Sequence, residues 1–428
     1  MRVLTVVGDL GLGGTQRAAQ NCTLGYKQTG CETAVLTIDA GGAREQELKN
    51  ADIPLFIGGA LPEEQSKALE YANDWKPDII HIHRRGFAEP KTSHILKELK
   101  TSQNRVLETN VFSRVDYSDD RNLIDVHLQL SSWCLWKWRQ WSRGMNPRPI
   151  GAVVPNMIDC SKFYPVSSDV RAAFRKNYGI PKEGFVFGRI GQSSLPKWSP
   201  IIINAFTEVA QKYPQVYLLV VGLPDELRAC IASISKNVQQ RIIEIPFIQG
   251  DENLRICYST IDTFLHASHI GESFGMVLAE AMLCGCPVVT LSTPDKDNSQ
   301  LEVVGHKRGG LVVTNQRSMV EGMVELIENC SLKQRLSQEG GKWIRSEYDI
   351  LQVMPNLLTI AEIALASKTR DELRQRLHND PKIITDIDPL VIKKLLKNTI
   401  GNIPIKKRLL MHLVNNPQLY RLYSRKLK

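Results

Sequence analysis

Two successive series of short β-rich runs, each run followed by a helix-like stretch, constrain the fold of this 428-residue chain more than any other feature. Strands that alternate with helices in this way are typical of βαβ units and of a parallel sheet. The β-rich runs of the first series lie at residues 3–7, 33–38, 78–83, 106–109 and 126–130. Helix-like stretches such as 14–26 and 63–75 separate them.

The second series starts after a turn-rich segment at residues 153–165, which carries Pro155, Asn156 and Pro165 and is typical of a linker. Its predicted strands lie at 184–190, 216–221, 242–245, 263–267, 288–291 and 310–313. A helical stretch at 346–365 follows, as one or two long helices. Because the chain is long for one domain, we expect an α/β protein with two Rossmann-like domains.

Two glutamates, Glu272 and Glu280, lie between the predicted strands at 263–267 and 288–291. The loop and helix between such strands are where open α/β sheets bind ligands. The helix is apolar except for Glu280 and is expected to be buried, so this carboxylate needs a partner. The free N–H groups at the start of the helix favour an anion such as phosphate. Carboxylates that bind hydroxyls beside a phosphate site predict a nucleotide sugar. A capping role for Glu272 and an arginine partner for Glu280 are the structural alternative.

The run Ser-His-Ile-Gly-Glu-Ser-Phe-Gly-Met-Val-Leu-Ala-Glu-Ala at 268–281 resembles the E-x7-E signature of the retaining family 4 glycosyltransferases. The segment at 155–165 is similar to the domain junction of that family. The resemblance covers about residues 1–365 and implies the GT-B architecture, in which two Rossmann-like parallel-sheet domains face a cleft. It implies an acceptor-side domain at 1–165 and a nucleotide-sugar domain at 166–345. A helix at 346–366 is expected to return to the first domain, and a basic helical tail is expected at 367–428.

The same resemblance assigns roles around the glutamates. Glu272 is expected to contact hydroxyls of the donor sugar in the catalytic centre, and Glu280 is expected to bind the ribose of the nucleotide. The residues between them at the helix start complete the expected donor site, namely Ser273, Phe274, Gly275 and Met276. Phe247 and Ile248, after another predicted strand, are expected near the base, where main-chain contacts leave UDP, GDP and ADP as open alternatives.

Two cations precede this region in the second domain. Breaking a sugar–diphosphate bond leaves negative charge on the departing phosphate, which a positive group must stabilise. Arg189 ends a predicted strand and Lys197 follows a loop, and the resemblance implies that both act on the diphosphate. Trp198 stands where the family has a glycine. Two exposed loop cations without a role in binding are the alternative.

We expect no metal and no cofactor, since no cluster of Asp and His has metal-ligand spacing. Asp295-x-Asp297 and Asp386-x-Asp388 match the D-x-D pattern of metal-dependent transferases, but neither follows a donor-domain strand in the required setting.

The first domain carries a glycine-rich turn, Leu10 to Arg17, after its first strand. Its glycines allow the backbone to approach a bulky anion. By resemblance, Gly13 and Gly14 face the donor diphosphate and Arg17 the acceptor, although a plain tight turn is the alternative. His83, at a strand end, is a further candidate acceptor contact. Asn110 stands where the family often has a histidine near the donor sugar, so its amide or main-chain carbonyl is expected in the catalytic centre.

The chain carries a net charge of +9, and residues 391–428 alone hold ten Lys or Arg with no Asp or Glu. The rest of the chain is therefore close to neutral. Mixed apolar and basic faces in this tail favour attraction to an anionic membrane surface, with a solvated helix pair or an arm packed on the body as alternatives. Four tryptophans at 133–141 favour either a membrane interface or burial between helices. No recognition fold for nucleic acid is visible, so none is expected as a partner.

Nine scattered cysteines fit a reducing cytoplasm, and no apolar run approaches the ~18 residues of a membrane span. We therefore expect a cytoplasmic protein that lies peripherally on the inner face of the membrane.

The combined reading is a retaining, metal-independent glycosyltransferase. It is expected to move a hexose or related sugar from a nucleoside diphosphate to a glycan or lipid-linked acceptor, in glycolipid or polysaccharide assembly such as lipopolysaccharide or capsule. Because Glu272 is expected to hold a hydroxyl, front-face departure with the leaving phosphate as base is favoured over a glutamate nucleophile. Two alternatives stay open, another nucleotide-sugar enzyme of this fold, such as an epimerase or a phosphorylase, and a non-catalytic nucleotide-sugar-binding or scaffold protein.

Overall fold

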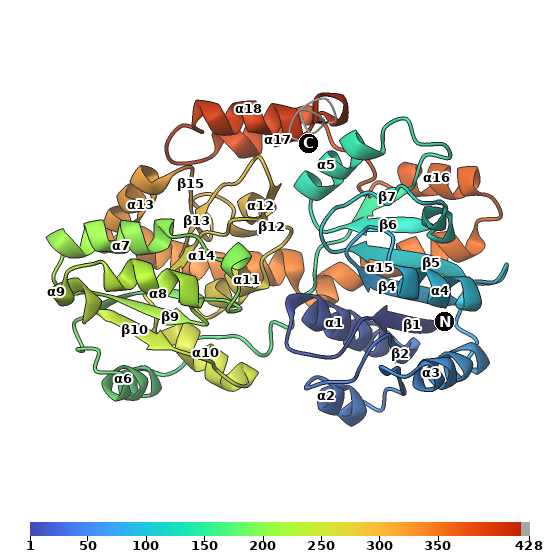
Figure 1. The fold of residues 1–428 in the computed structure, drawn as a ribbon, viewed down its shortest axis with the longest axis horizontal. Coiled ribbons are helices and arrows are strands. Elements are labelled where there is room, and N and C mark those ends of the chain that lie inside the picture. Colours follow the sequence, from blue (N-terminus) through green and yellow to red (C-terminus); the bar gives the residue numbers. More distant parts are fainter. Residues whose placement is uncertain (421–428) are drawn as a thin grey trace. The chain divides into compact units, whose positions relative to one another are not determined.

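A computed structural model describes residues 1–420 of the chain, which form two compact units. Unit 1 comprises Met1–Met157 and Tyr348–Pro389, and unit 2 comprises Ile158–Glu347 and the chain from Leu390 onward. Each unit holds one parallel sheet with helices on both faces (Figure 1). The predicted α/β fold class with two Rossmann-like sheets is confirmed. The domain boundaries predicted at residues 165, 345 and 366 stay predictions.

The sheet of unit 1 has seven strands in the order β3-β2-β1-β4-β5-β6-β7, and every neighbouring pair is parallel. These strands are β1 (Arg2–Val7), β2 (Glu32–Thr37), β3 (Leu55–Ile57), β4 (Ile79–Arg84), β5 (Arg105–Asn110), β6 (Val126–Gln129) and β7 (Gly151–Val153). The helical elements are α1 (Gly14–Gln28), α2 (Glu45–Asn50), α3 (Pro62–Asp74), α4 (Pro90–Leu99), η1 (Asp119–Leu123), α5 (Ser132–Ser142), α15 (Ile350–Ala366) and α16 (Arg370–Asn379).

The sheet of unit 2 has six strands in the order β10-β9-β8-β11-β13-β15. They are β8 (Phe185–Ile190), β9 (Val216–Val221), β10 (Ile242–Ile245), β11 (Thr263–His266), β13 (Val288–Leu291) and β15 (Gly310–Val313), and a separate pair joins β12 (Gly271–Glu272) to β14 (Asp297–Asn298). The helices are α6 (Ser168–Asn177), η2 (Leu195–Lys197), α7 (Ile201–Lys212), α8 (Asp225–Ala232), α9 (Lys236–Gln239), α10 (Asp251–Thr260), α11 (Met276–Leu283), α12 (Gln300–Val304), α13 (Gln316–Glu328), α14 (Cys330–Tyr348), α17 (Pro389–Lys397) and α18 (Ile405–Val414).

Every strand predicted from the sequence is present, and each end lies within one residue of the predicted bound. Their apolar runs are continuous because a parallel sheet covered on both faces buries both sides of each strand. The strands that the sequence did not predict are β3, β7, β12 and β14, which have only two or three residues each. A segment this short has no hydrophobic period that a sequence pattern can show.

The core of unit 1 depends on α15, which follows the long segment Ile158–Glu347 of unit 2 in the sequence. This helix buries Met354, Leu357 and Ile360 against the sheet and against α1. Gly25 of α1 allows the close approach, since a Cβ there would lie 2.8 Å from the side chain of Met354. Leu373 and Leu377 of α16 join the same core. The tryptophan-rich helix α5 buries Trp133 and Trp138, which favours burial over a membrane interface for these two side chains.

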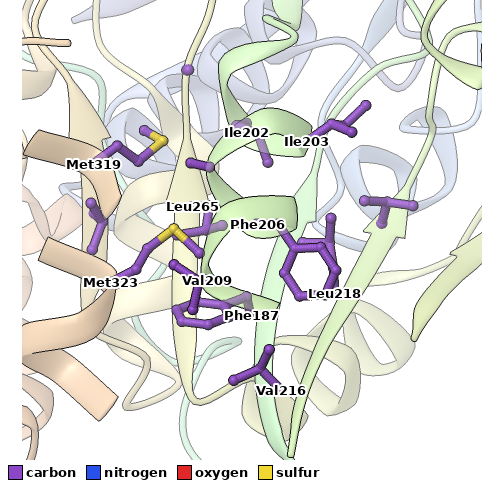
Figure 2. Close-up of a cluster of buried hydrophobic side chains, with 14 of the residues drawn as sticks. Phe187, Ile202, Ile203, Phe206, Val209, Val216, Leu218, Leu265, Met319 and Met323 are labelled. Atoms are coloured by element: carbon purple, nitrogen blue, oxygen red, sulfur yellow. The ribbon is translucent and has the colours of Figure 1, made fainter. Parts of the chain in front are cut away.

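The core of unit 2 lies between its sheet and two helices. Phe206 and Val209 of α7 and Met323 of α13 pack against strand residues such as Phe187 (Figure 2). Leu265 of β11 joins this cluster. The other face of β11 carries Phe264, whose ring lies 5.8 Å from that of Tyr258 on α10. The carboxyl ends of the central strands, where the loops to η2 and β12 begin, are therefore anchored from both faces.

From Leu390 onward the basic tail belongs to unit 2 and contains the helices α17 and α18. Ile392 of α17 is buried, and Ile400 pairs with Val313 of β15 as a parallel bridge. Lys407 of α18 donates to the carbonyl of Ser292 at 3.4 Å. Residues 421–428, which belong to the predicted basic tail, lie outside the described residues. No helix among residues 1–420 combines the length and apolar character that crossing a bilayer requires.

We predict that Phe206→Ala lowers the free energy of unfolding by about 3–5 kcal/mol, because it leaves a cavity in the core of unit 2. Denaturant unfolding of the full chain, followed by circular dichroism, measures the change. Phe247→Ala is the matched control, since the side chain of Phe247 is 62% exposed in the same unit. Equal losses in both variants would contradict the packing described here.

Candidate functional site

The candidate site of unit 2 is built around the short strand β12, which presents Glu272. Gly271 has a φ of +72°, and a Cβ there would lie 1.8 Å from the main-chain oxygen of Asp297. A glycine is therefore required where β12 passes β14. The main-chain oxygen of Glu272 accepts a hydrogen bond from the N–H of Ser299 at 2.8 Å. These contacts fix the backbone of Glu272, so that its side chain has a defined position.

The Glu272 carboxylate is buried and contacts two basic groups from other elements. Lys197 Nζ, at the end of η2, donates to Oε2 at 3.0 Å. His266 Nε2, at the end of β11, lies 3.3 Å from Oε1. Because a carboxylate only accepts, the neutral His266 ring carries its proton on Nε2, and its Nδ1 accepts from the Thr290 hydroxyl at 3.0 Å. The predicted neighbours Glu272 and Lys197 therefore meet, together with a histidine.

The environment keeps Glu272 ionised. Burial opposes ionisation of this carboxyl, but the charge of Lys197 and the hydrogen bond from His266 together hold its pKa well below the usual range. Burial and the charge of Arg189 lower the pKa of His266 to about 4, against an opposing effect of Glu272. At neutral pH the group is thus a carboxylate beside a neutral imidazole. Glu272 can accept hydrogen bonds from hydroxyls but has no proton to donate.

Arg189 lies beneath this group at the end of β8 and is 1% exposed. Its guanidinium donates to the main-chain oxygens of Ile190 and Lys197 at 2.9 and 2.7 Å. It also lies over the rings of Trp198 and Phe264, at 5.2 and 5.9 Å from their centroids. Burial lowers its pKa to about 10, with Glu272 opposing the shift, so it stays charged at neutral pH.

Trp198 explains how a bulky side chain occupies the place where a glycine was expected. The residue is fully buried and its indole N–H donates to the oxygen of Gln192 at 2.9 Å. The loop between β8 and α7 therefore folds over the indole ring, and Arg189 binds the end of that loop. The Ser268 hydroxyl donates to the oxygen of Pro196 at 3.1 Å and joins this loop to the segment that leads to β12.

Helix α11 follows β12 and carries the second glutamate. It begins at Met276, two residues after Phe274, where the apolar run of the sequence starts. Gly275, just before the helix, has a φ of +95°. Glu280 is buried, and its Oε2 accepts a hydrogen bond from the Tyr258 hydroxyl at 3.0 Å. Burial and the neighbouring Glu280 raise the pKa of Tyr258 well above its ordinary value. Tyr258 is thus a partner that the sequence did not predict.

The remaining donor-side residues differ in exposure. Ser273 and Phe274, between the two glutamates, are both buried. Phe247, after β10, is 62% exposed, and Ile248 is partly exposed. A large exposed aromatic ring is compatible with contact to a nucleotide base, and this role stays a prediction.

In unit 1 the glycine-rich turn leads directly into α1. Gly13 is the N-cap of this helix, and Gly14 is its first residue. The Arg17 N–H donates to the oxygen of Gly13 at 3.0 Å, which starts the helical hydrogen-bonding pattern. A Cβ added to Gly14 would meet no atom within 4 Å. The turn therefore leaves open space at a helix N-terminus, as an anion site requires.

His83 lies inside unit 1 next to His81, with ring centroids 4.7 Å apart. Neither of its ring nitrogens has a hydrogen-bond partner, and burial lowers its pKa to about 3. Within residues 1–420, Cys22, His81 and His83 form the one group of three with potential metal-ligand atoms within 4.8 Å of one another. However, the His81 nitrogens already contact Tyr26 and Thr109 at 3.1 and 2.8 Å, and burial raises the pKa of the Cys22 thiol. The group is therefore better explained as polar packing.

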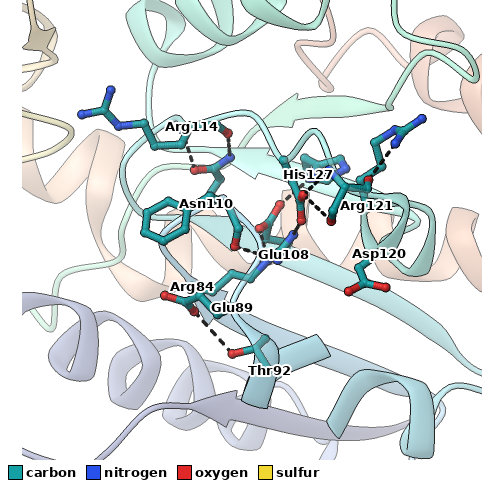
Figure 3. A network of polar contacts seen from close by, with 12 residues as sticks. Arg84, Glu89, Thr92, Glu108, Asn110, Arg114, Asp120, Arg121 and His127 are labelled. Atoms are coloured by element: carbon teal, nitrogen blue, oxygen red, sulfur yellow. Dashed lines mark hydrogen bonds and ion pairs between the residues drawn. The ribbon is translucent and has the colours of Figure 1, made fainter. Parts of the chain in front are cut away.

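Asn110, at the end of β5, is fully buried and its amide is used within the protein. Its Nδ2 donates to the oxygen of Arg114 at 2.7 Å, and its Oδ1 accepts from the Arg114 N–H at 3.2 Å (Figure 3). Beneath it, Glu108 is bonded to Arg84 and His127, and Arg84 also contacts Asp116 at 3.1 Å. This buried ionic network holds the loop after β5. The catalytic role expected of Asn110 stays a prediction.

The sequence did not predict His266, Tyr258 or Thr290 as part of the site. The sequence does carry a signal for His266, since it is the one titratable residue of the strand Thr263–His266 and ends that strand next to the glutamate motif. Tyr258 gave no such signal, because an aromatic residue on a helix is ordinarily part of a core.

Three comparisons bear on this arrangement. Residues 170–343 match the family model described as glycosyl transferases group 1. A phosphatidyl-myo-inositol mannosyltransferase of Mycobacterium tuberculosis is 25% identical over 224 residues, covering 50% of this chain and 54% of that protein. An uncharacterized glycosyltransferase of Methanocaldococcus jannaschii is 21% identical over 380 residues, covering 83% of this chain and 95% of that protein. The chain thus spans about half the length of the first of these relatives.

Among solved structures, the Anabaena protein HepE in complex with UDP-glucose aligns with a TM-score of 0.66 and 19% identity, covering 84% of this chain and 99% of that chain. At this identity the likeness shows the fold, which is the GT-B type with two Rossmann-like sheets.

We predict that His266 titrates with a pKa of about 4 in the folded protein and that Glu272→Gln lowers this value further, because the Glu272 carboxylate favours the protonated ring. Since an unfolded histidine titrates near 6.5, this group contributes stability above that pH and loses it as pH falls toward 4. NMR of labelled histidine side chains measures the pKa. Glu226→Gln, at an exposed position of the same unit, is the control and should leave it unchanged. A rise in Glu272→Gln would contradict the contact.

Proposed function

We propose that this chain, which belongs to the group 1 glycosyltransferase family through residues 170–343, transfers a sugar from a nucleoside diphosphate to an acceptor hydroxyl with retention of configuration and without a metal ion. The observation that carries the proposal is the buried Glu272 carboxylate, held ionised between Lys197 and His266. A group of this kind accepts hydrogen bonds from sugar hydroxyls. It is unsuited to act as a general acid.

The charges around Glu272 support a role in diphosphate departure. The side chain of Lys197 is 29% exposed, so its ammonium group is accessible to a ligand while it contacts Glu272. Arg189 contributes a second charge, and it binds the main chain at Lys197. We assign to Lys197 direct contact with the leaving diphosphate and to Arg189 the positioning of the Lys197 loop together with a long-range stabilisation of the same charge.

Glu280 is assigned to the nucleotide ribose. Its carboxylate lies on the second turn of α11, and the Tyr258 hydroxyl holds it at 3.0 Å. A carboxylate has about four acceptor positions, so it can bind more than one hydroxyl group. The start of α11, at Gly275 and Met276, offers main-chain N–H groups to the phosphate.

The chemical step follows from these roles. The acceptor oxygen forms a bond to the anomeric carbon on the face from which the diphosphate departs, while the bond from that carbon to the phosphate oxygen breaks. The acceptor proton passes to the departing phosphate oxygen, so no glutamate needs to be protonated. Gly13 and Gly14 stay proposed contacts of the donor diphosphate, Asn110 stays a proposed catalytic group, and Arg17 and His83 stay proposed contacts of the acceptor.

The acceptor proposed is a glycan or lipid-linked acceptor at an anionic membrane, reached from the cytoplasmic side. Exposed apolar side chains alternate with basic ones on the two tail helices, since Leu390, Ile405 and Leu409 are 64%, 76% and 65% exposed beside exposed lysines and Arg408. Such a surface attracts anionic lipid. One of the relatives is named for a lipid acceptor, phosphatidyl-myo-inositol, which supports the same class of acceptor.

We predict that Glu272→Gln and Lys197→Met each lower turnover of the cognate nucleotide sugar by about 100-fold or more, because each removes a group that acts on the donor in the transition state. The cognate nucleotide is first found by a thermal-shift screen with UDP, GDP, ADP and their sugars, since a ligand that binds the folded state raises its apparent stability. Release of nucleoside diphosphate measures turnover. Glu226→Gln should retain full activity, and equal slow hydrolysis by wild type and Glu272→Gln would refute the assignment.

We predict that Leu409→Glu weakens binding to phosphatidylglycerol vesicles at least 10-fold, because it removes an inserting apolar group and adds a negative charge. Leu351→Glu is the control, since Leu351 of α15 is 63% exposed outside the tail. Substitution is preferable to a chain ending at Ala366, which would also remove the buried Leu373 and Leu377. Vesicle flotation measures binding. No difference between the two variants would reject docking through the tail.

A further inference from the structure

Unit 1 contains a cavity of about 390 Å³ that none of the roles above uses. It lies between the end of α5, the segment before β7, α16 and residues 385–386. Its lining includes Arg139, Arg148, Arg374, His378, Thr385 and Asp386. Its volume falls within the range typical of small-molecule sites, ~300–1,000 Å³.

Arg139 forms the fixed inner wall of the cavity. Its guanidinium donates to the main-chain oxygens of Pro149, Gly151 and Thr385 at 3.0, 3.2 and 2.8 Å. These bonds join the edge strand β7 to the segment after α16, where the Val153 N–H also donates to the oxygen of Ile384 at 2.9 Å. The Nε atom of Arg139 is buried without a hydrogen-bond partner. The guanidinium is thus held in one orientation by carbonyl groups that do not neutralise its charge.

Two further guanidinium groups converge on the same cavity. Burial lowers the pKa of Arg139 to about 10, and the nearby charges of Arg148 and Arg374 lower it in the same direction, against an opposing effect of Asp386. The three guanidinium groups therefore lie close enough to act on one another electrostatically.

The two acids of the lining offset part of the arginine charge. Asp371 pairs with Arg374 at 2.6 Å, and its side chain is 93% exposed. The Asp386 carboxylate accepts a hydrogen bond from the Ile387 N–H at 3.0 Å. His378 and Thr385 contact each other at 3.2 Å and add polar groups to the wall. Three arginines against two acids leave the lining net positive.

We propose that this cavity binds a phosphoryl group, carried either by a soluble phosphorylated compound or by a lipid headgroup. Guanidinium groups match the geometry and charge of phosphate oxygens, and a pre-positioned one binds them with little loss of side-chain entropy. The cavity is larger than a phosphate ion requires, so the phosphoryl group is part of a larger molecule. All lining residues belong to unit 1, whereas the proposed donor residues Glu272, Lys197 and Glu280 belong to unit 2. The inference does not rest on the proposed function.

Arg148 is the residue with which to test the proposal. It is exposed and lies before the edge strand, so reversing its charge leaves the hydrogen bonds of Arg139 in place. Arg143, five positions earlier in the same connection, is also exposed and is absent from the cavity lining. Arg148→Glu and Arg143→Glu thus change the net charge of the protein equally. Only Arg148→Glu changes the charge of the cavity lining.

The experiment measures binding of inorganic pyrophosphate to the full chain by isothermal titration calorimetry, and binding of phosphatidylglycerol and phosphatidylcholine vesicles by flotation. Leu409→Glu is included as a background in the vesicle arm, so that docking through the tail is separated from the cavity. We expect Arg148→Glu to weaken binding of pyrophosphate, of phosphatidylglycerol or of both at least 10-fold, with Arg143→Glu close to wild type. Loss of pyrophosphate binding in the calorimetric measurement indicates a soluble ligand. Loss of vesicle binding alone indicates a lipid headgroup.

The proposal is overturned if wild type binds neither probe, or if Arg148→Glu and Arg143→Glu weaken binding equally, since that result reports net charge alone. Arg374→Gln provides a second variant and should weaken the same arm as Arg148→Glu. Turnover of the nucleotide sugar is measured in parallel. If turnover is normal while neither probe binds the cavity, the cavity proposal fails and the proposed function does not.

Discussion

The buried contact between Glu272 and Lys197 is the interaction on which the candidate site depends. A carboxylate that is removed from water is stable only if charge and hydrogen bonds replace its hydration. Here Lys197 comes from the loop after β8, His266 from the end of β11, and Glu272 from β12, so one carboxylate joins β11 and β12 to a loop some 75 residues earlier in the sequence. Removal of either charged partner would leave the other poorly compensated.

The other features of unit 2 serve this contact. Arg189 binds the main chain at Lys197 and lies over Trp198, which fills the space beneath the loop. Gly271 lets β12 pass close to β14, so that Glu272 points toward the lysine. The chemistry that results is electrostatic. In the function proposed above, a fixed anion accepts hydroxyl hydrogen bonds and fixed cations stabilise departing phosphate, as transfer from a nucleoside diphosphate sugar requires.

Much of this site was predictable because the relevant residues lie within short stretches of sequence. Glu272 and Glu280 are joined by a short run whose apolar character predicts a buried helix, and Arg189 and Lys197 flank one loop. His266 and Tyr258 were not predicted, because their roles arise from contacts between elements, and each is also an ordinary core residue. The prediction for Asn110 shows the same limit. Its position after β5 was expected to face a substrate, while the structure shows its amide bonded to the main chain of Arg114.

The sequence by itself determined the alternation of strands and helices, hence two parallel sheets, and the position of the glutamates beyond the carboxyl end of a central strand. Hydrophobic period and turn residues are local properties, and they suffice for that level of detail. Only the tertiary structure decided which side chains meet. It brought Lys197 and His266 to Glu272, placed α15 and α16 in the core of a unit that begins some 350 residues earlier, and gathered Arg139, Arg148 and Arg374 around one cavity. Such contacts depend on how elements pack, and a pattern along the chain does not contain that information.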